Sequence, residues 1–273
     1  MFGPAILLPH QVDVKNLKII PNREAKSTIK NFLIGYGPRG LLHVQLPECE
    51  AFNLSPIINP LTKMPYNANK LNLTIKMSED RKSCQAAIAM FNDLKTQIIK
   101  LAAENSLMVY GRSKNEAFIS DCFTDMVRYS KKKDSNGNIT NELNTDLPPL
   151  VSFPVYKEED GKLGLQAESA SGKPICLDNR DIKGSYVTII ARLNGMWTNG
   201  SASGMTWRII KVRVIFVSRP NKNISFLADE DRLATDYDSD DELDPEYDEP
   251  QKKIPQRMNM FPESEDEDEA QPV

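Results

Sequence analysis

Two stretches in the last third of the sequence alternate between apolar and polar side chains and are rich in residues that favour strands. They are residues 184–197 and 205–217, and a polar loop of Thr, Asn, Gly, Ser and Ala at 198–204 separates them. Alternation with a period of two places successive side chains on opposite faces of a strand. The pattern therefore predicts a long antiparallel hairpin from Gly184 to Val217, on which the rest of the chain is organised.

Strict alternation gives each strand of this hairpin an apolar face and a mixed face. In the second strand the apolar face holds Ile210, Val212, Val214 and Phe216, and the mixed face holds Trp207, Ile209, Lys211, Arg213 and Ile215. In the first strand the mixed face holds Tyr186, Thr188, Ile190 and Arg192. Rings that stack on bases and cations that bind phosphates are what single-stranded nucleic acid requires. The candidate contacts are Tyr186, Arg192, Trp197, Trp207, Arg208, Lys211 and Arg213. The alternative, a solvent-facing sheet with its tryptophans in the core, stays open.

Shorter strands are predicted at 16–20, 28–34, 40–46, 70–77, 150–156, 163–167 and 174–177. The turn residues from Gly35 to Gly40 predict a hairpin between 28–34 and 40–46. Tyr36 and Arg39 at its tip are further candidate nucleic-acid contacts, or simply solvated. The prolines of residues 47–69 predict a long irregular connection.

One long amphipathic helix is predicted from Glu79 to about Glu104, with Ser78 as its N-cap. Its apolar stripe consists of Cys84, Ala87, Ile88, Phe91, Leu94, Ile98 and Leu101. A second helix is predicted over 114–126, with Ser113 and Glu116 as a capping box. Its Phe118, Cys122 and Phe123 are expected to pack inward.

A basic run follows this second helix. Residues 128–147 are expected to form a flexible excursion that begins Arg-Tyr-Ser-Lys-Lys-Lys. Its Tyr129, Lys131, Lys132 and Lys133 are candidates for clamping a phosphate backbone. A solvated charge run explains the same residues equally well.

The net charge of −4 conceals a strong division along the chain. Residues 228–273 contain 18 acidic and 4 basic residues, a net of −14, which leaves 30 basic and 20 acidic residues, a net of +10, in residues 1–227. A segment of such like charge with few large apolar residues cannot form a core. We therefore expect a basic domain over 1–227 and a disordered acidic tail over 228–273. Ser239 and Ser264 each precede an acid by three residues, as acidophilic-kinase sites do, although acidic tails often carry this pattern by chance.

Signals of other protein classes are missing from the sequence. The four cysteines are scattered without a paired spacing, and neither histidine adjoins a catalytic or metal-binding motif. No apolar run approaches the length of a membrane span. We expect no enzymatic activity, no cofactor, no metal and no membrane contact, and a soluble intracellular protein with reduced thiols.

The elements together predict a mainly β chain with one long helix, of the α+β class. Strands before the helix must pair with strands after it if its apolar stripe is to be buried, so we expect one domain. An OB-like barrel, closed or partly open, is the expected arrangement because closure removes exposed sheet edges.

Residues 183–197 and 204–209, with Gly-Ser leading into Asn-Gly-Met-Trp and Gly-Met-Thr-Trp-Arg-Ile after the loop, resemble the single-stranded-DNA-binding proteins of phages and large DNA viruses. The resemblance implies a helix-interrupted OB barrel that binds single strands cooperatively and without sequence preference. It also implies an acidic tail that occupies the groove without DNA and otherwise contacts a polymerase, helicase or primase. One departure is the last residue, since phage tails of this kind end in an aromatic residue and this chain ends in Val273.

Two other functions are compatible with the sequence: an acidic-tailed chaperone of basic partners, and a virion assembly or scaffold protein whose β domain forms homo-oligomers. The basic charge of residues 1–227 favours the DNA-binding protein, because a chaperone has no need of a cationic body. For a viral replication protein, the expected location is the host nucleus or a cytoplasmic replication site.

Overall fold

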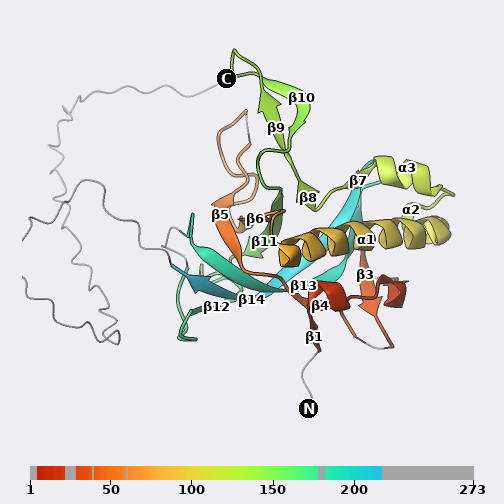
Figure 1. Ribbon diagram of the computed structural model, residues 1–273. Helices are drawn as coiled ribbons and strands as arrows, with labels where there is room; N and C mark the ends of the chain where they lie inside the picture. Colours follow the sequence, from red (N-terminus) through yellow and green to blue (C-terminus); the bar gives the residue numbers. More distant parts are fainter. Residues whose placement is uncertain (1–4, 22–28, 39, 60, 178–181, 217–273) are drawn as a thin grey trace, which may run out of the picture. The chain divides into compact units, whose positions relative to one another are not determined.

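The computed structural model of the chain describes residues 5–21, 29–38, 40–59, 61–177 and 182–216. Within them lie a sheet of 12 strands, a separate two-stranded ribbon and three α-helices (Figure 1). One compact unit, Met1–Pro220, contains all of these elements.

The strands of the large sheet are β1 (Ile6–Leu7), β2 (Leu17–Ile20), β3 (Lys30–Tyr36), β4 (His43–Gln45), β5 (Cys49–Pro56), β6 (Lys70–Lys76), β7 (Phe123–Thr124), β8 (Val127–Arg128), β11 (Leu150–Tyr156), β12 (Gln166–Ser169), β13 (Tyr186–Thr198) and β14 (Ser203–Ile215). The ribbon consists of β9 (Ser130–Lys133) and β10 (Ile139–Asn144). The helices are α1 (Lys82–Glu104), α2 (Ser106–Tyr110) and α3 (Glu116–Asp121), and 3-10 turns lie at Pro9–Gln11 and Val14–Asn16.

The predicted hairpin is confirmed as β13 and β14, and it is the centre of the sheet. Along its other edge β13 pairs in succession with β3, β4 and β5, so one strand holds three earlier segments. β5, β6 and β11 continue the sheet as an antiparallel meander. β11 then contacts β14, but no ladder joins these two strands in the described part of the chain. The barrel is therefore partly open, with its seam between β11 and β14.

The long helix is confirmed, and its stripe forms part of the core. Cys84, Ala87, Phe91, Leu94 and Ile98 are all buried. The helix begins at Lys82, three residues later than predicted, and its N-cap is Arg81 rather than Ser78. The Ser78 hydroxyl bonds the Asp80 carboxylate instead of a backbone amide.

Two predictions for the N-terminal half are wrong. β3 pairs with β2 and β13, and a single bridge from Tyr36 to Gly40 replaces the hairpin predicted between 28–34 and 40–46. Gly37 takes a positive φ of 65° in this turn, as the turn residues indicated. The supposedly irregular 47–69 segment contains the eight residues of β5. A register shift between Ala51 and Asn53 interrupts the alternation of β5, which hid this strand from the sequence pattern.

The region after α1 also differs from its prediction. The second helix is only Glu116–Asp121. Asn115 caps its start by accepting from the Phe118 amide at 2.9 Å, and strand β7 begins at Phe123. Of its expected inward residues Phe123 is buried, while Phe118 and Cys122 are half-buried. The excursion at 128–147 contains the ordered ribbon β9–β10. The strand predicted at 163–167 is β12, placed slightly later, and the one at 174–177 is reduced to a bridge.

None of the helices in the described ranges has the length and apolarity needed to cross a bilayer.

Candidate nucleic-acid interface

A cavity of about 510 Å³ lies at the open seam of the barrel. Its lining comes from β3 (31–33), the end of β11 and the residues after it (154–158, 164–165), β13 (194–196) and β14 (206–209). Because β11 and β14 are not paired here, their edges stand apart and leave room for a ligand. The cavity is large enough for an unstacked nucleobase, within the usual range for ligand sites.

Two arginines lie opposite each other beside this cavity. Arg192 of β13 pairs in register with Arg208 of β14, which lines the cavity and is exposed. Like charges directly opposite on a sheet are destabilising. Among the residues that the structure describes, neither guanidinium has a carboxylate within ion-pair distance. The hairpin therefore places two like charges opposite each other without a neutralising carboxylate in the described part of the chain.

A β-bulge positions one of these arginines. The register of the hairpin shifts between Leu193 and Gly195, which leaves Asn194 as an extra residue at the cavity. The Asn194 side-chain oxygen accepts a hydrogen bond from Arg192 Nε at 2.8 Å. The bulge thus holds the Arg192 guanidinium, through its Nε, against Asn194, which lines the cavity.

An exposed ring and further cations complete the rim, and the sequence prediction missed them. Tyr156, at the end of β11, lines the cavity and is 52% exposed. Lys70 Nζ lies 5.7 Å from the centroid of this ring, and Lys157 follows on the lining. Glu158 is the one acidic residue among the lining residues. The sequence does contain a signal for Tyr156. In the alternating run 150–156 the apolar Val155 belongs on the core face, so its neighbour Tyr156 belongs on the outer face.

Trp207 is on the opposite face from the one predicted. It is 2% exposed and its ring packs edge-on against Phe91 and Phe153, at centroid distances of 5.6 and 6.3 Å. The cause is a second register shift: Lys211 pairs with Ile190 and Ile209 with Ala191, so Ile210 is an extra residue. The shift reverses the alternation and puts Trp207 and Ile209 on the same core face as Val212 and Val214. The prediction that Trp207 and Ile209 lie on the mixed face is therefore wrong. Trp207 is among the residues that line the cavity, but at 2% exposure it offers almost no surface to a base.

Trp197, the other tryptophan, remains half-buried at the end of β13. Its partner in register is Gly204, and a Cβ added to that glycine would lie 2.8 Å from Trp197 Nε1. The glycine therefore lets the indole lie flat across the strand. Tyr186, at the other end of β13, is 41% exposed on the predicted mixed face.

Two predicted phosphate contacts share one carboxylate as an ion-pair partner. Glu168 of β12 is buried and forms ion pairs with Lys211 Nζ and with Arg213, whose Nη2 is 2.7 Å away. Arg213 Nε donates to the same carboxylate at 2.8 Å. Hydrogen bonds from Lys211 and then Arg213 hold the pKa of Glu168 below its usual range. The sequence could not show this pairing, because β12 lies more than 40 residues before its partners.

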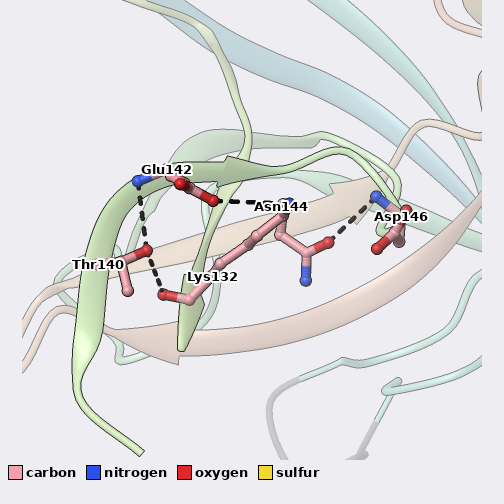
Figure 2. A network of polar contacts seen from close by, with 5 residues as sticks. All are labelled: Lys132, Thr140, Glu142, Asn144 and Asp146. Atoms are coloured by element: carbon pink, nitrogen blue, oxygen red, sulfur yellow. Dashed lines mark hydrogen bonds and ion pairs between the residues drawn. The ribbon is translucent and has the colours of Figure 1, made fainter. Parts of the chain in front are cut away.

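The basic run predicted at 128–133 lies at the start of the ribbon β9–β10. Tyr129 donates a hydrogen bond to Glu79 at 2.7 Å, and this bond raises the pKa of the phenol. Lys132 lies 3.7 Å from Glu142 on the opposite strand, and its carbonyl accepts from Thr140 (Figure 2). Lys131 and Lys133 point out beside exposed Leu143 and Ile139.

Of the two residues at the predicted tip of the first hairpin, the structure describes only Tyr36. The Tyr36 hydroxyl accepts from the Asp13 amide at 3.1 Å, so it holds the N-terminal segment. Arg39 lies outside the described residues, as do Ser239, Ser264 and the whole acidic segment.

Compared with family models and with curated proteins, the sequence matches none. Among solved structures it is similar to gp2.5, a single-stranded DNA binding protein encoded by bacteriophage T7, with 12% identity, coverage of 70% of this chain and 92% of that chain, and a TM-score of 0.37. It is also similar to the single-stranded DNA-binding protein from bacteriophage Enc34 in complex with ssDNA, with 14% identity, coverage of 75% and 98%, and a TM-score of 0.38. Both are described as phage proteins that bind single-stranded DNA.

Proposed function

We propose that the chain binds single-stranded DNA without sequence preference and acts in viral-type DNA replication or recombination. The observation that carries the proposal is the pair Arg192 and Arg208, opposed in register beside the cavity and without a carboxylate partner in the described part of the chain. A phosphate between two guanidiniums removes their repulsion and gains charge-assisted hydrogen bonds. Backbone phosphates are common to all sequences, so such binding carries no base preference.

The neighbouring ring favours a single strand over a duplex. Tyr156 exposes half of its surface beside Lys70, next to a cavity that can hold a base. Stacking of a base on a tyrosine requires an unpaired base, which a duplex does not offer. Binding of single-stranded DNA is also what the printed descriptions of the phage proteins state for those proteins.

The two parts of the chain have different roles in this proposal. Residues 1–227, with a net charge of +10, form the DNA-binding domain, and residues 228–273, with a net charge of −14, compete with DNA for it. The same acidic segment contacts a polymerase, helicase or primase when DNA displaces it, and phosphorylation at Ser239 or Ser264 strengthens the competition. These parts of the proposal follow from the charge and the family resemblance.

Titration of fluorescent poly-dT at several salt concentrations tests the proposal. The wild-type chain should bind with a log–log salt slope of about −0.7 for each phosphate neutralised, and a duplex of equal length should bind more weakly. Replacing both Arg192 and Arg208 by glutamine should weaken binding and make the slope shallower by about 0.7, the contribution of the one phosphate that the pair binds.

Lys100→Gln is the control, because Lys100 is exposed on α1 and its loss removes one charge away from the rim. It should leave the slope nearly unchanged. A salt-independent affinity, or equal affinity for the duplex, contradicts the proposal.

A further inference from the structure

The loop at the end of the β5–β6 hairpin exposes an unusual number of large apolar side chains. Within residues 57–69, which we call the 57–69 loop, they are Ile57, Ile58, Leu61, Met64 and Tyr66. Leu61 is 90% exposed, and Met64 and Tyr66 are each 65% exposed. Contiguous exposed apolar residues on a soluble domain mark an interaction site.

The described part of this loop is held in shape by its own hydrogen bonds. The Asn59 amide donates to the Met64 carbonyl at 2.8 Å, and the Lys63 amide donates to the Asn59 carbonyl at 2.9 Å. The Asn59 side chain accepts from the Leu61 amide at 2.9 Å. Exposure of the apolar side chains is therefore built into the loop.

Lys63 occupies a conformation that does not suit a lysine. Its φ is +57°, which makes it the only residue other than glycine with a positive φ in the described part of the chain. Glycine adopts this conformation without cost, whereas a lysine there is strained. Because strain of this kind clusters at functional sites, Lys63 is a candidate contact residue.

The outer part of the hairpin also carries charge of one sign. From Ala51 to Asn69 the sequence has no Asp or Glu, and Lys63 and Lys70 lie in or next to the 57–69 loop, whereas Lys76 at the other end of β6 forms an ion pair with Glu50 of β5. An acid-free segment that combines exposed apolar groups with lysines fits a polyanion that also presents flat apolar surfaces. Single-stranded DNA has both properties, through its phosphates and its unpaired bases.

The 57–69 loop is continuous with the rim of the cavity. The Lys157 amide donates to the Asn69 carbonyl at 2.9 Å, and Lys70 lies over the Tyr156 ring. Both Tyr156 and Lys157 line the cavity. A DNA strand that leaves the cavity across Tyr156 therefore reaches Asn69 and Lys70, where the 57–69 loop joins β6.

We propose that the tip of the 57–69 loop is a second contact for the same DNA strand, in which Lys63 binds a phosphate while Leu61, Met64 and Tyr66 contact bases. This inference rests on the proposed function, and it adds a contact at the far end of the hairpin. Lys63 at the tip lies seven residues after Pro56 and eight before Leu71, the last paired residues of β5 and β6, which is at most roughly 23 Å at the rise of a strand. The second contact therefore matters only for oligonucleotides long enough to extend past the cavity.

Lys63→Gly is the sharpest test, since it removes the charge and relieves the backbone strain together. Its melting temperature should stay equal to or above that of the wild type, while affinity for long oligo-dT falls and the salt slope becomes shallower by about 0.7. Tyr66→Ala should weaken binding of long oligo-dT roughly 5- to 150-fold, the range that loss of one stacked base corresponds to.

A series of oligo-dT lengths separates the two proposals. Short oligonucleotides that fill only the cavity should bind both variants like the wild type, and the curves should diverge as length increases. If the wild type binds oligo-dT but both variants match it at every length, the tip contact is refuted and the proposed function stands. If the wild type binds no oligo-dT, the proposed function fails first. Loss of self-association in Tyr66→Ala without DNA, seen by sedimentation, together with unchanged DNA affinity, assigns the loop to a second copy of the chain and also overturns the inference.

Discussion

The indole of Trp207 lies edge-on to the ring of Phe91, with centroids 5.6 Å apart and an angle of 78° between the planes. Phe153 meets the same indole at 6.3 Å and 90°. One residue of β14 is therefore in contact with both α1 and β11. This three-ring cluster joins the helix to the two strands that border the open seam.

Trp207→Ala should consequently act on stability. Removing a buried tryptophan costs about 3–5 kcal/mol of unfolding free energy, to which the lost edge-on contacts contribute. The folded fraction should bind single-stranded DNA with an affinity close to that of the wild type. Denaturant unfolding and DNA titration on one preparation check both points. Loss of affinity at unchanged stability would instead assign the ring to the DNA.

The position of Trp207 shows where sequence patterns stop being sufficient. The alternation of residues 205–217 predicted the strand correctly but assumed an uninterrupted period of two. The extra residue Ile210 reverses the period halfway along, so Trp207 moves to the core. The amino-acid sequence around Ile210 does not mark it as a bulge, because a bulge is defined by how two strands pair.

The same limit explains β5 and the basic residues of β14. The register shift at Phe52 and the nearby prolines concealed β5, and Lys211 and Arg213 gave no sign of their partner Glu168. Local signals did better: the stripe on α1 predicted its buried face, and both strands of the long hairpin were predicted. Contacts between distant segments, including the seam of the barrel, require the fold itself.

Glu168 should make the unfolding free energy of the domain depend on pH in the acidic range. Its pKa is lowered in the folded state by Lys211 and Arg213, so its contribution is complete above the unfolded-state value of about 4.3. That contribution is lost as the pH falls towards the lower folded-state pKa. Thermal unfolding of the wild type between pH 6 and pH 3 should show this loss, and Glu168→Gln should have a flatter profile in the same window. Parallel profiles for the two proteins would show that the ion pairs contribute nothing.

Gly195 should not tolerate a side chain. A Cβ at this position would lie 1.9 Å from the Phe32 carbonyl oxygen, a backbone atom of the neighbouring strand β3. Gly195→Ala should therefore force β3 and β13 apart and destabilise the domain by about 1–3 kcal/mol or more. Gly35→Ala is the matched control, because its added Cβ meets only side-chain atoms of Ile20 and Lys18, at 3.0 Å and beyond, which can move. Equal losses in the two variants would contradict this account.

Deleting residues 229–273 should raise the affinity of the chain for single-stranded DNA. The deleted segment contains 18 acidic and 4 basic residues, a net charge of −14. A tethered polyanion competes for the cationic rim at an effective concentration in the millimolar range. Titration of poly-dT against the full and the shortened chain measures the difference.

The salt dependence of this gain identifies its cause. Because competition by the acidic segment is electrostatic, the gain should be largest at low salt and shrink as the Debye length falls towards 10 Å at about 0.1 M. A variant with the same length but with its acids replaced by Asn and Gln should bind DNA like the shortened chain, since only the charge competes. Phosphorylation at Ser239 and Ser264 should lower affinity further, because each phosphate adds about −1.5 to −2 charges. Equal affinity of full and shortened chains at every salt concentration would leave the acidic segment without a role at the rim.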